Sequence, residues 1–244
     1  METAGRESKM NEFQIIVADP PWRFKNWSMS QLTQRGEKWA RRNGRSPYPV
    51  MTTEDICKIP VWEIAAKDSL LYLWATWPKM MDALQVMDSW GFEYITQAFT
   101  WIKQNPSGCG WHFGLGYYTH GNSEVVLIGK RGKGVKRVDK GVSSLVIYPR
   151  GQHSAKPPTV ASRIERLHGD GVPRVELFAR RPVTGWSTWG NEVELSPGTE
   201  PLWDYVAPPY EAIVDEDEYN GLPPEQEANM PNGAYEPGEQ MLLV

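Results

Sequence analysis

The chain has 244 residues, of which 40% are apolar, and a formal net charge of −4. This is enough apolar material for one sizeable core, and no apolar run reaches the ~18 residues that a membrane span needs. The polar start, METAGRESKMNE, lacks an apolar signal region, so we expect a cytoplasmic protein that makes no membrane contact. Two cysteines without CxxC spacing and four scattered histidines predict no metal site.

The charge is divided unevenly along the chain. Residues 200–244 contain eleven acids and no Lys or Arg, which leaves 26 basic against 19 acidic residues in 1–199. A basic body indicates a polyanionic partner such as nucleic acid, and the acidic end either solubilises the protein or competes for its basic face. We expect a disordered stretch at 1–12, one domain at 13–192, and a disordered, acidic, proline-rich tail at 193–244.

The first predicted element is a buried strand that stops abruptly at the motif Asp19-Pro20-Pro21-Trp22. Ligands of open α/β sheets bind at the carboxyl ends of the strands, which is where this pattern holds the Asp19 carboxylate. A fixed carboxylate with an aromatic residue three positions on suits a planar ring that carries an amine. The alternative is an acid that merely caps a turn while the two prolines end a strand.

An exocyclic amine is a poor nucleophile because its lone pair is delocalised into the ring. The Asp19 carboxylate and a proline carbonyl can accept its N–H bonds, which draws the nitrogen toward a tetrahedral shape and frees the lone pair. The prolines fix φ and therefore the position of these acceptors. Trp22 can stack on the ring or line its pocket.

The next stretch, 23–49, is basic and aromatic but has no sustained periodicity. An irregular segment of this length beside an active site is typical of a binding loop, with bases for phosphate and Tyr48 for stacking, although an ordinary surface loop has the same composition. The further elements alternate: helix from Thr52 to Pro60, strand 69–75, helix 78–91, strand 94–103, glycine-rich aromatic segment 105–122, strand 123–128, helix 157–169, strand 174–180 and a short segment at 186–191. This order predicts an α/β fold with a mixed, largely parallel sheet of about six to eight strands.

A cationic run follows the 123–128 strand. It contains Lys130, Arg131, Lys133, Lys136 and Arg137 within a glycine-rich stretch. Such a loop is suited to contact phosphates, and a purely solvated hairpin is the alternative.

Several blocks resemble one family in their sequence and order. They are DPPW after a short apolar strand, Pro47-Tyr48, Leu70–Trp77, Trp101–Lys103, Asn122–Lys130, Lys156-Pro157, Glu176–Arg180 and Gly190-Asn191. The chain resembles the MT-A family of adenine N6-methyltransferases, related to the messenger-RNA methylating enzyme and with many compact prokaryotic and phage members. Where the family often has Gly after Glu-Leu-Phe, this chain has Ala179.

The resemblance implies an S-adenosylmethionine-dependent methyltransferase of Rossmann-like fold with permuted motif order. It implies catalytic roles for Asp19, Pro20, Pro21 and Trp22. Donor contacts are implied for Asp19, Lys156, Phe178, Arg180 and Asn191. Among the substrate contacts that we predict, Tyr48 and Lys103 join the cationic run of Lys130, Arg131, Lys133, Lys136 and Arg137.

Methyl transfer to the N6 amine of adenine in DNA is therefore the expected activity, in a prokaryotic or phage-infected cell. RNA is the alternative substrate, and a non-catalytic, nucleic-acid-binding subunit is the alternative role. The chemistry of Asp19 by itself also allows cytosine N4 or a small amine. A homodimer or a partner methyltransferase subunit is compatible with the resemblance.

Overall fold

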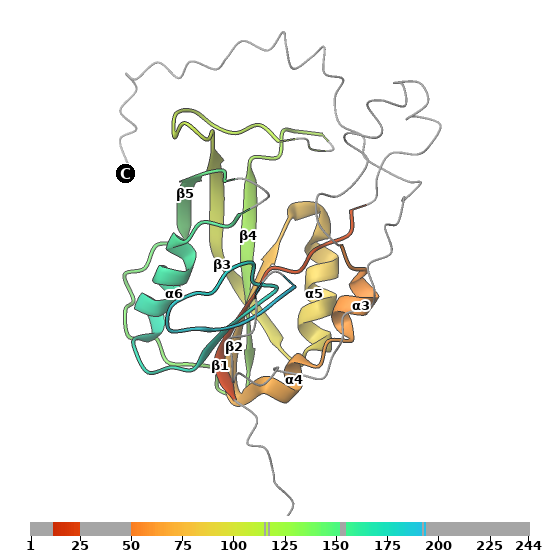
Figure 1. The fold of residues 1–244 in the computed structure, drawn as a ribbon, viewed down its shortest axis with the longest axis vertical. Helices are drawn as coiled ribbons and strands as arrows, with labels where there is room; N and C mark the ends of the chain where they lie inside the picture. The colour runs from red at the N-terminus through yellow and green to blue at the C-terminus, as the bar shows by residue number, and fades with distance from the viewer. Residues whose placement is uncertain are drawn as a thin grey trace, which may run out of the picture.

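The computed structural model of this chain describes residues 12–24, 50–114, 116, 118–151, 155–191 and 193. A seven-stranded sheet runs through this part of the chain, with helices packed on both of its faces (Figure 1). The strands are β1 (Phe13–Ala18), β2 (Ala65–Ala75), β3 (Glu93–Gln104), β4 (Ser123–Arg131), β5 (Leu145–Pro149), β6 (Arg174–Leu177) and β7 (Ser187–Trp189). The helices are α3 (Thr53–Cys57), α4 (Val61–Ile64), α5 (Met80–Ser89) and α6 (Thr159–His168), with a 3-10 turn, η1 (Trp77–Lys79).

The strand order is β5-β3-β4-β2-β1-β6-β7, and only β4 runs against the others. The carboxyl ends of six strands and the beginning of β4 therefore meet at one edge of the sheet, which we call the carboxyl edge. The predicted mixed, largely parallel sheet is confirmed. The reversal of β4 has a consequence for the site, because the residues that begin β4 and those that end it lie at opposite edges.

Side chains alternate along the strands between two apolar cores. In β1, Ile16 and Ala18 face one core, whereas Ile15 and Val17 face the other. A register irregularity between Phe13 and Ile15 places Phe13 on the same side as Ile16, three residues further on. Because β1 is central and covered on both faces, its sequence is a continuous apolar run instead of an alternating one.

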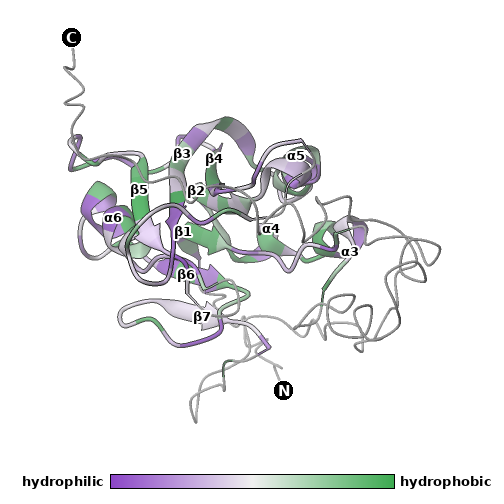
Figure 2. Ribbon diagram, turned by 90° about the horizontal axis from the view of Figure 1, so that it is seen from above, coloured by the Kyte–Doolittle hydropathy of each residue, from purple (hydrophilic) through white to green (hydrophobic). Residues whose placement is uncertain are grey.

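Each core is closed by helices of one face. The α5 helix contributes Ala83, Val86 and Met87 to the first core, and α6 contributes Val160 and Ile164 to the second. Seen from above, α6 lies on one side of the mostly apolar strands and α3 and α5 on the other (Figure 2). None of the helices in the described ranges has the length and apolarity needed to cross a membrane.

Two elements differ from the sequence-based expectation. The first helix begins where predicted, since Thr52 Oγ1 caps it by accepting from the Asp55 amide at 3.1 Å, but α4 follows it separately after Pro60. The short strand β5 was not predicted. Only Val146 of its five residues is buried, because β5 is an edge strand with a single neighbour, so its sequence lacks the apolar run of a central strand.

A buried histidine ties the cationic loop after β4 to the core. His168, at the end of α6, is 4% exposed, and its Nε2 lies 2.8 Å from the Tyr72 hydroxyl. Its Nδ1 lies 3.0 Å from the carbonyl oxygen of Lys136. The neutral ring serves both contacts, with Nδ1–H donating to the carbonyl and Nε2 accepting from Tyr72. Burial lowers the pKa of His168, and Arg174 and Arg137 lower it further against the opposing effect of the Lys136 carbonyl.

We expect this histidine to make stability depend on pH. Because its pKa is lower in the folded than in the unfolded state, protonation favours unfolding, so stability is complete above the ordinary value of 6.5 and falls as the pH drops through the folded value. Urea unfolding of the wild type between about pH 8 and about pH 5.5 is expected to show this loss. The His168→Gln variant keeps a donor and an acceptor without titrating, so an equal pH dependence in the variant would contradict the prediction.

Candidate active site

The Asp19-Pro20-Pro21-Trp22 turn begins directly after β1 and is fixed on several sides. The Trp22 amide donates to the Pro20 carbonyl at 2.8 Å, and the Met51 amide donates to the Pro21 carbonyl at 2.8 Å. The Trp22 ring is 5% exposed, and its Nε1 donates to the Trp74 carbonyl at 3.1 Å. Trp22 therefore packs mainly into the core of the α5 face and fixes the turn, and little of its ring is exposed for stacking on a base.

Asp19 is bound by a lysine from the other end of the sequence. Lys156 Nζ lies 3.0 Å from Asp19 Oδ2, and the two side chains are only 19% and 25% exposed. Lys156 comes just before α6 and also lies 5.4 Å from the centre of the Trp74 ring. A partly buried ammonium beside a carboxylate and an aromatic face holds both groups in place.

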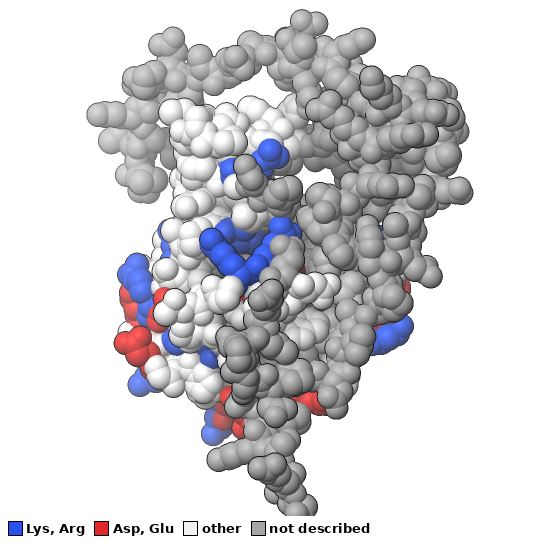
Figure 3. Space-filling view, viewed as in Figure 1, with Lys and Arg blue, Asp and Glu red and all other residues white. Residues whose placement is uncertain are grey.

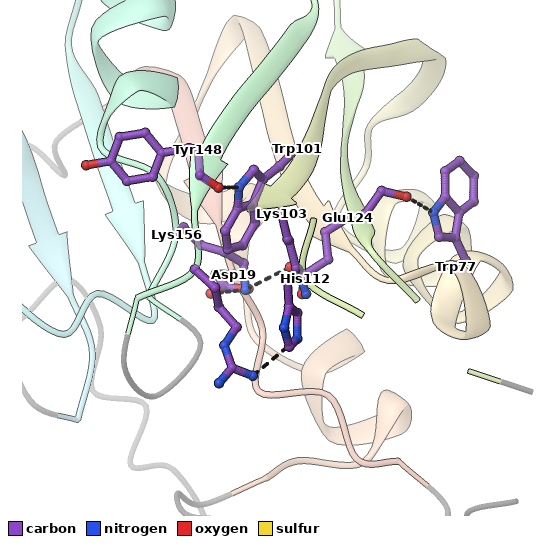
Figure 4. A network of polar contacts seen from close by, with 10 residues as sticks. Asp19, Trp77, Trp101, Lys103, His112, Glu124, Tyr148 and Lys156 are labelled. Atoms are coloured by element: carbon purple, nitrogen blue, oxygen red, sulfur yellow. Dashed lines mark hydrogen bonds and ion pairs between the residues drawn. The ribbon is translucent and has the colours of Figure 1, made fainter. Parts of the chain in front are cut away.

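A second acid, Glu124, continues the network. Glu124 Oε2 lies 3.2 Å from Lys156 Nζ, and its Oε1 lies 2.5 Å from Lys103 Nζ. Figure 4 shows the four charged side chains converging, in the order Asp19, Lys156, Glu124, Lys103. Two acids and two bases thus alternate, and each inner group has an opposite charge on both sides.

Strand alternation explains why these groups meet. Asp19 follows Val17 by two residues, Glu124 precedes Val126 by two, and Lys103 follows Trp101 by two. Val17, Val126 and Trp101 all belong to the core on the α6 face, so the three charged residues point to that same face at the carboxyl edge. Lys156 reaches them because it leads into α6, which covers this face.

The pKa values follow from burial and from these pairings. Burial raises the pKa of Asp19 above 3.8, against the opposing effect of Lys156, and Glu124 raises it further. For Glu124, burial alone would raise the pKa, but Lys156 and Lys103 together hold it below 4.5. For Lys156, burial is outweighed by Asp19 and Glu124, so its pKa is raised above the ordinary value. The two carboxylates therefore favour the charged form of Lys156.

The residues predicted to contact the donor surround the ends of β6 and β7, on the other side of β1. Phe178 follows β6 with φ of 62°, a left-handed conformation that is costly without glycine, and its ring packs edge-on against Trp189 at 5.5 Å between centroids. Asn191 is exposed two residues beyond Trp189, the last residue of β7. Arg180 is close enough to Asp19 to lower its pKa.

An additional acid, Glu176, lies in β6 near Asp19. Burial and then Asp19 raise the pKa of Glu176 to about 7. The Lys156 cation, the Phe178 ring and the acid and amide groups of this edge match the carboxylate, apolar and hydroxyl groups of an amino-acid nucleoside such as S-adenosylmethionine. The residues present therefore fit the predicted methyl donor.

The structure does not bring the cationic run to this site. Lys130 and Arg131 end β4, and the loop with Lys133, Lys136 and Arg137 follows them. Because β4 is antiparallel, these residues lie at the opposite edge, about 26 Å along the strand from Ser123. They do not line the site at Asp19, so their predicted contact with substrate phosphates stays a prediction that applies only to a part of the polynucleotide distant from Asp19.

The same residues have local partners at that edge. Arg131 donates to the Trp62 carbonyl at 2.8 Å, and Lys130 pairs with Glu93 at 3.1 Å. Tyr48 and nearly all of the 23–49 loop lie outside the described residues, as do most of the segments 1–12 and 193–244. Within the described ranges, no group of three or more His, Cys, Asp or Glu could hold a metal ion.

Glu124 is the main site residue that the sequence analysis missed. It stands in the stretch SEVVLI, where a single acid at the beginning of a strand reads as an exposed strand end. The available signal was its spacing of two residues from a core valine, combined with the antiparallel direction of β4. The direction of β4 depends on how the strands pair in the sheet, and the residues of this segment alone do not reveal it.

We expect removal of the Glu124 charge to destabilise the protein strongly. The Glu124→Gln substitution leaves Lys103 without its carboxylate partner and Lys156 with Asp19 alone, and breaking a buried pair in this way costs about 3 kcal/mol. Glu93→Gln is the matched control, because Glu93 pairs with Lys130 while its side chain is 74% exposed, and its loss costs less than about 1 kcal/mol. Equal unfolding free energies for the two variants in urea would contradict the buried network.

A second prediction concerns the close approach of β7 to the residue after Phe178. A Cβ on Gly190 would lie 2.1 Å from the Ala179 carbonyl oxygen and 2.7 Å from its amide nitrogen, so Gly190→Ala forces the two backbones apart. We expect a loss of about 2 kcal/mol in unfolding free energy. Gly141→Ala is the control, since the nearest atom there is a carboxylate oxygen at 3.3 Å, and unchanged stability of Gly190→Ala would show that this edge can adjust.

Comparison with known proteins places the chain in a family. The MT-A70 family matches residues 13–192. The chain is 34% identical over 192 residues to Type II methyltransferase M.MunI from Mycoplasma sp. The aligned region covers 75% of this chain and 78% of that relative. It is 29% identical over 194 residues to human N(6)-adenine-specific methyltransferase METTL4, and 24% identical over 191 residues to the human N(6)-adenosine-methyltransferase catalytic subunit METTL3.

The two human relatives are longer proteins, and the aligned regions cover 37% of METTL4 and 29% of METTL3. The match to the family spans every block of the sequence that carried the resemblance, from the strand before Asp19 to Asn191. The expected α/β methyltransferase fold and S-adenosylmethionine as donor are confirmed with it. This chain belongs to the MT-A70 family of S-adenosylmethionine-dependent methyltransferases.

Proposed function

We propose that this chain transfers the methyl group of S-adenosylmethionine to the N6 amine of adenine in DNA, inside a prokaryotic or phage-infected cell. The observation that carries the proposal is the buried Lys156 that holds Asp19 at the carboxyl end of β1, beside a turn fixed by two prolines. The ion pair with Lys156 holds the Asp19 carboxylate, and the two prolines hold the backbone carbonyl beside it. Both groups can therefore accept N–H bonds from an amine without moving far.

Asp19 acts on the target amine through its free oxygen. Lys156 engages Oδ2, and within the described residues the other carboxylate oxygen accepts no hydrogen bond. That oxygen accepts one N–H bond of the amine. The Pro20 carbonyl, which already accepts from the Trp22 amide, has a second lone pair for the other N–H bond. With both N–H bonds held by acceptors, the nitrogen lone pair is directed away from the ring system.

The transfer itself needs no covalent enzyme intermediate. A bound S-adenosylmethionine supplies a methyl group that its sulfonium centre has already activated. The lone pair of N6 forms the new N–C bond, the electrons of the broken C–S bond stay on sulfur, and one N–H proton leaves through the Asp19 carboxylate to water. Holding amine and methyl group in line supplies much of the rate enhancement.

We assign the donor to the region between Asp19 and the ends of β6 and β7. Lys156 would pair with the donor carboxylate, Phe178 would pack against its sugar, and Arg180 and Asn191 would hydrogen-bond the ribose hydroxyls or the adenine edge. The raised pKa of Glu176, about 7, keeps part of this acid protonated at neutral pH, so that Glu176 can donate as well as accept a hydrogen bond.

The sequence identities of the relatives favour DNA over RNA as the substrate. The match of 34% identity is named a type II methyltransferase, and that of 29% identity is named an N(6)-adenine-specific methyltransferase. The relatives named N(6)-adenosine-methyltransferases lie at 24–26% identity. A homodimer or a partner methyltransferase subunit is compatible with this activity.

The proposal predicts that Asp19→Ala abolishes methylation of adenine in DNA, with kcat/KM reduced by at least about 10²-fold because the amine loses its acceptor. The protein is incubated with labelled S-adenosylmethionine and matched DNA and RNA oligonucleotides, and the digested nucleosides are identified by mass spectrometry. Asp139→Ala is the control, because Asp139 pairs with Arg166 on the surface at 2.7 Å. Methylation confined to RNA, or no transfer despite donor binding, would contradict the proposal.

A further inference from the structure

Large aromatic side chains remain exposed along the carboxyl edge, beyond the charged network. Trp77, which follows β2, is 54% exposed, and its Nε1 donates to Ser123 Oγ at the beginning of β4. Trp111 is 43% exposed and forms an isolated bridge with Gln104, the last residue of β3. Phe113, two residues further on, is 54% exposed. We call Trp77, Trp111 and Phe113 the aromatic edge.

The aromatic edge is continuous with the site at Asp19. The neighbouring strands run in the order β1, β2, β4, β3, so three strand spacings of about 4.8 Å separate β1 from β3. The pairings place Asp19 level with Phe99 of β3, and Gln104 lies five residues, about 16 Å, further along that strand. The separation of Asp19 from Gln104 is therefore about 22 Å, the length of about six stacked nucleotides at 3.4 Å each. A strand that places its target base at Asp19 can therefore lay the flanking nucleotides across the aromatic edge.

The electrostatics of the aromatic edge fit a polyanion. The segment 105–122 contains no Asp or Glu, and its backbone is pinned to β3 by the His112 amide, which donates to the Lys103 carbonyl at 2.9 Å. The guanidinium of Arg150, just beyond β5, lies 3.3 Å from His112 Nε2. The upper part of the face in Figure 3, as far as it is described, carries Lys and Arg side chains and no acid.

A duplex offers few exposed base faces, whereas an unpaired strand offers one at every nucleotide. Exposed aromatic residues beside a cation are the means by which proteins bind single strands without reading sequence. We propose that the aromatic edge, with Arg150, binds nucleotides that flank the target in unpaired form, so that the substrate is a single-stranded or locally melted polynucleotide. This inference depends on the proposed function in one respect, which is that the target base binds at Asp19.

The test measures binding and not methyl transfer, so it is separable from the activity of the site. Fluorescence anisotropy compares a labelled single-stranded DNA, the same sequence as a duplex, and that duplex with a mismatch at the target adenine, with a single-stranded RNA as a further arm. The wild type is expected to bind the single strand and the mismatched duplex more tightly than the perfect duplex. Equal or tighter binding of the perfect duplex would overturn the proposal.

Substitutions test whether the exposed aromatic side chains are responsible for single-strand binding. Trp111→Ala with Phe113→Ala is expected to weaken single-strand binding by about 5–150-fold, the range that corresponds to about 1–3 kcal/mol of stacking per base. Trp62→Ala is the matched control, because Trp62 has the same 43% exposure as Trp111 but precedes β2 at the opposite edge. Circular dichroism checks that all variants are folded.

Two results would count against the aromatic edge. Unchanged single-strand affinity of the double variant would overturn the proposal. So would a double variant whose only defect is weaker self-association in sedimentation, since the aromatic edge would then be an interface between copies of this chain. Weaker binding without methyl transfer by the wild type would support the aromatic edge and reject the proposed activity, which keeps the two conclusions distinct.

Discussion

The structure of the site depends on the placement of one cation. Lys156 Nζ lies 3.0 Å from Asp19 and 3.2 Å from Glu124, and it is the group that joins the end of β1 to the beginning of β4 across the intervening β2. Two buried carboxylates so close together would repel each other without it, and one would take up a proton. The lysine therefore allows Glu124 to stay charged and keeps Asp19 in a fixed position, although burial still raises the pKa of Asp19.

The unfavourable free energy of burying this charged network is offset by interactions with the surrounding residues. Burying several charges is unfavourable unless each has partners, and here the alternation of acids and bases supplies them. The aromatic rings of Trp74 and Trp101 face the two ammonium groups at 5.4 and 5.1 Å and exclude water from one side. The result is a charged site at the edge of an apolar sheet, in which the Asp19 carboxylate is held in place by its partners.

The two ends of the sheet have different properties. The carboxyl edge holds the charged network, the ends of β6 and β7, and the exposed side chains of Trp77, Trp111 and Phe113. The opposite edge holds the cationic loop, which is fixed to the core through His168 and the Lys136 carbonyl. A long basic stretch in a sequence thus need not lie where the chemistry occurs, because the direction of one strand decides at which edge it emerges.

The sequence by itself determined the family, most strands and helices, and the residues of the turn after β1. Each of these depends on local patterns: an apolar run, a cap at Thr52, and a run of prolines after an acid. The tertiary structure decided the rest. The antiparallel direction of β4 brought Glu124 to Asp19 and sent Lys130–Arg137 to the opposite edge, and packing turned the Trp22 ring into the core. Strand direction and order arise from contacts between segments distant in sequence, which no local pattern records.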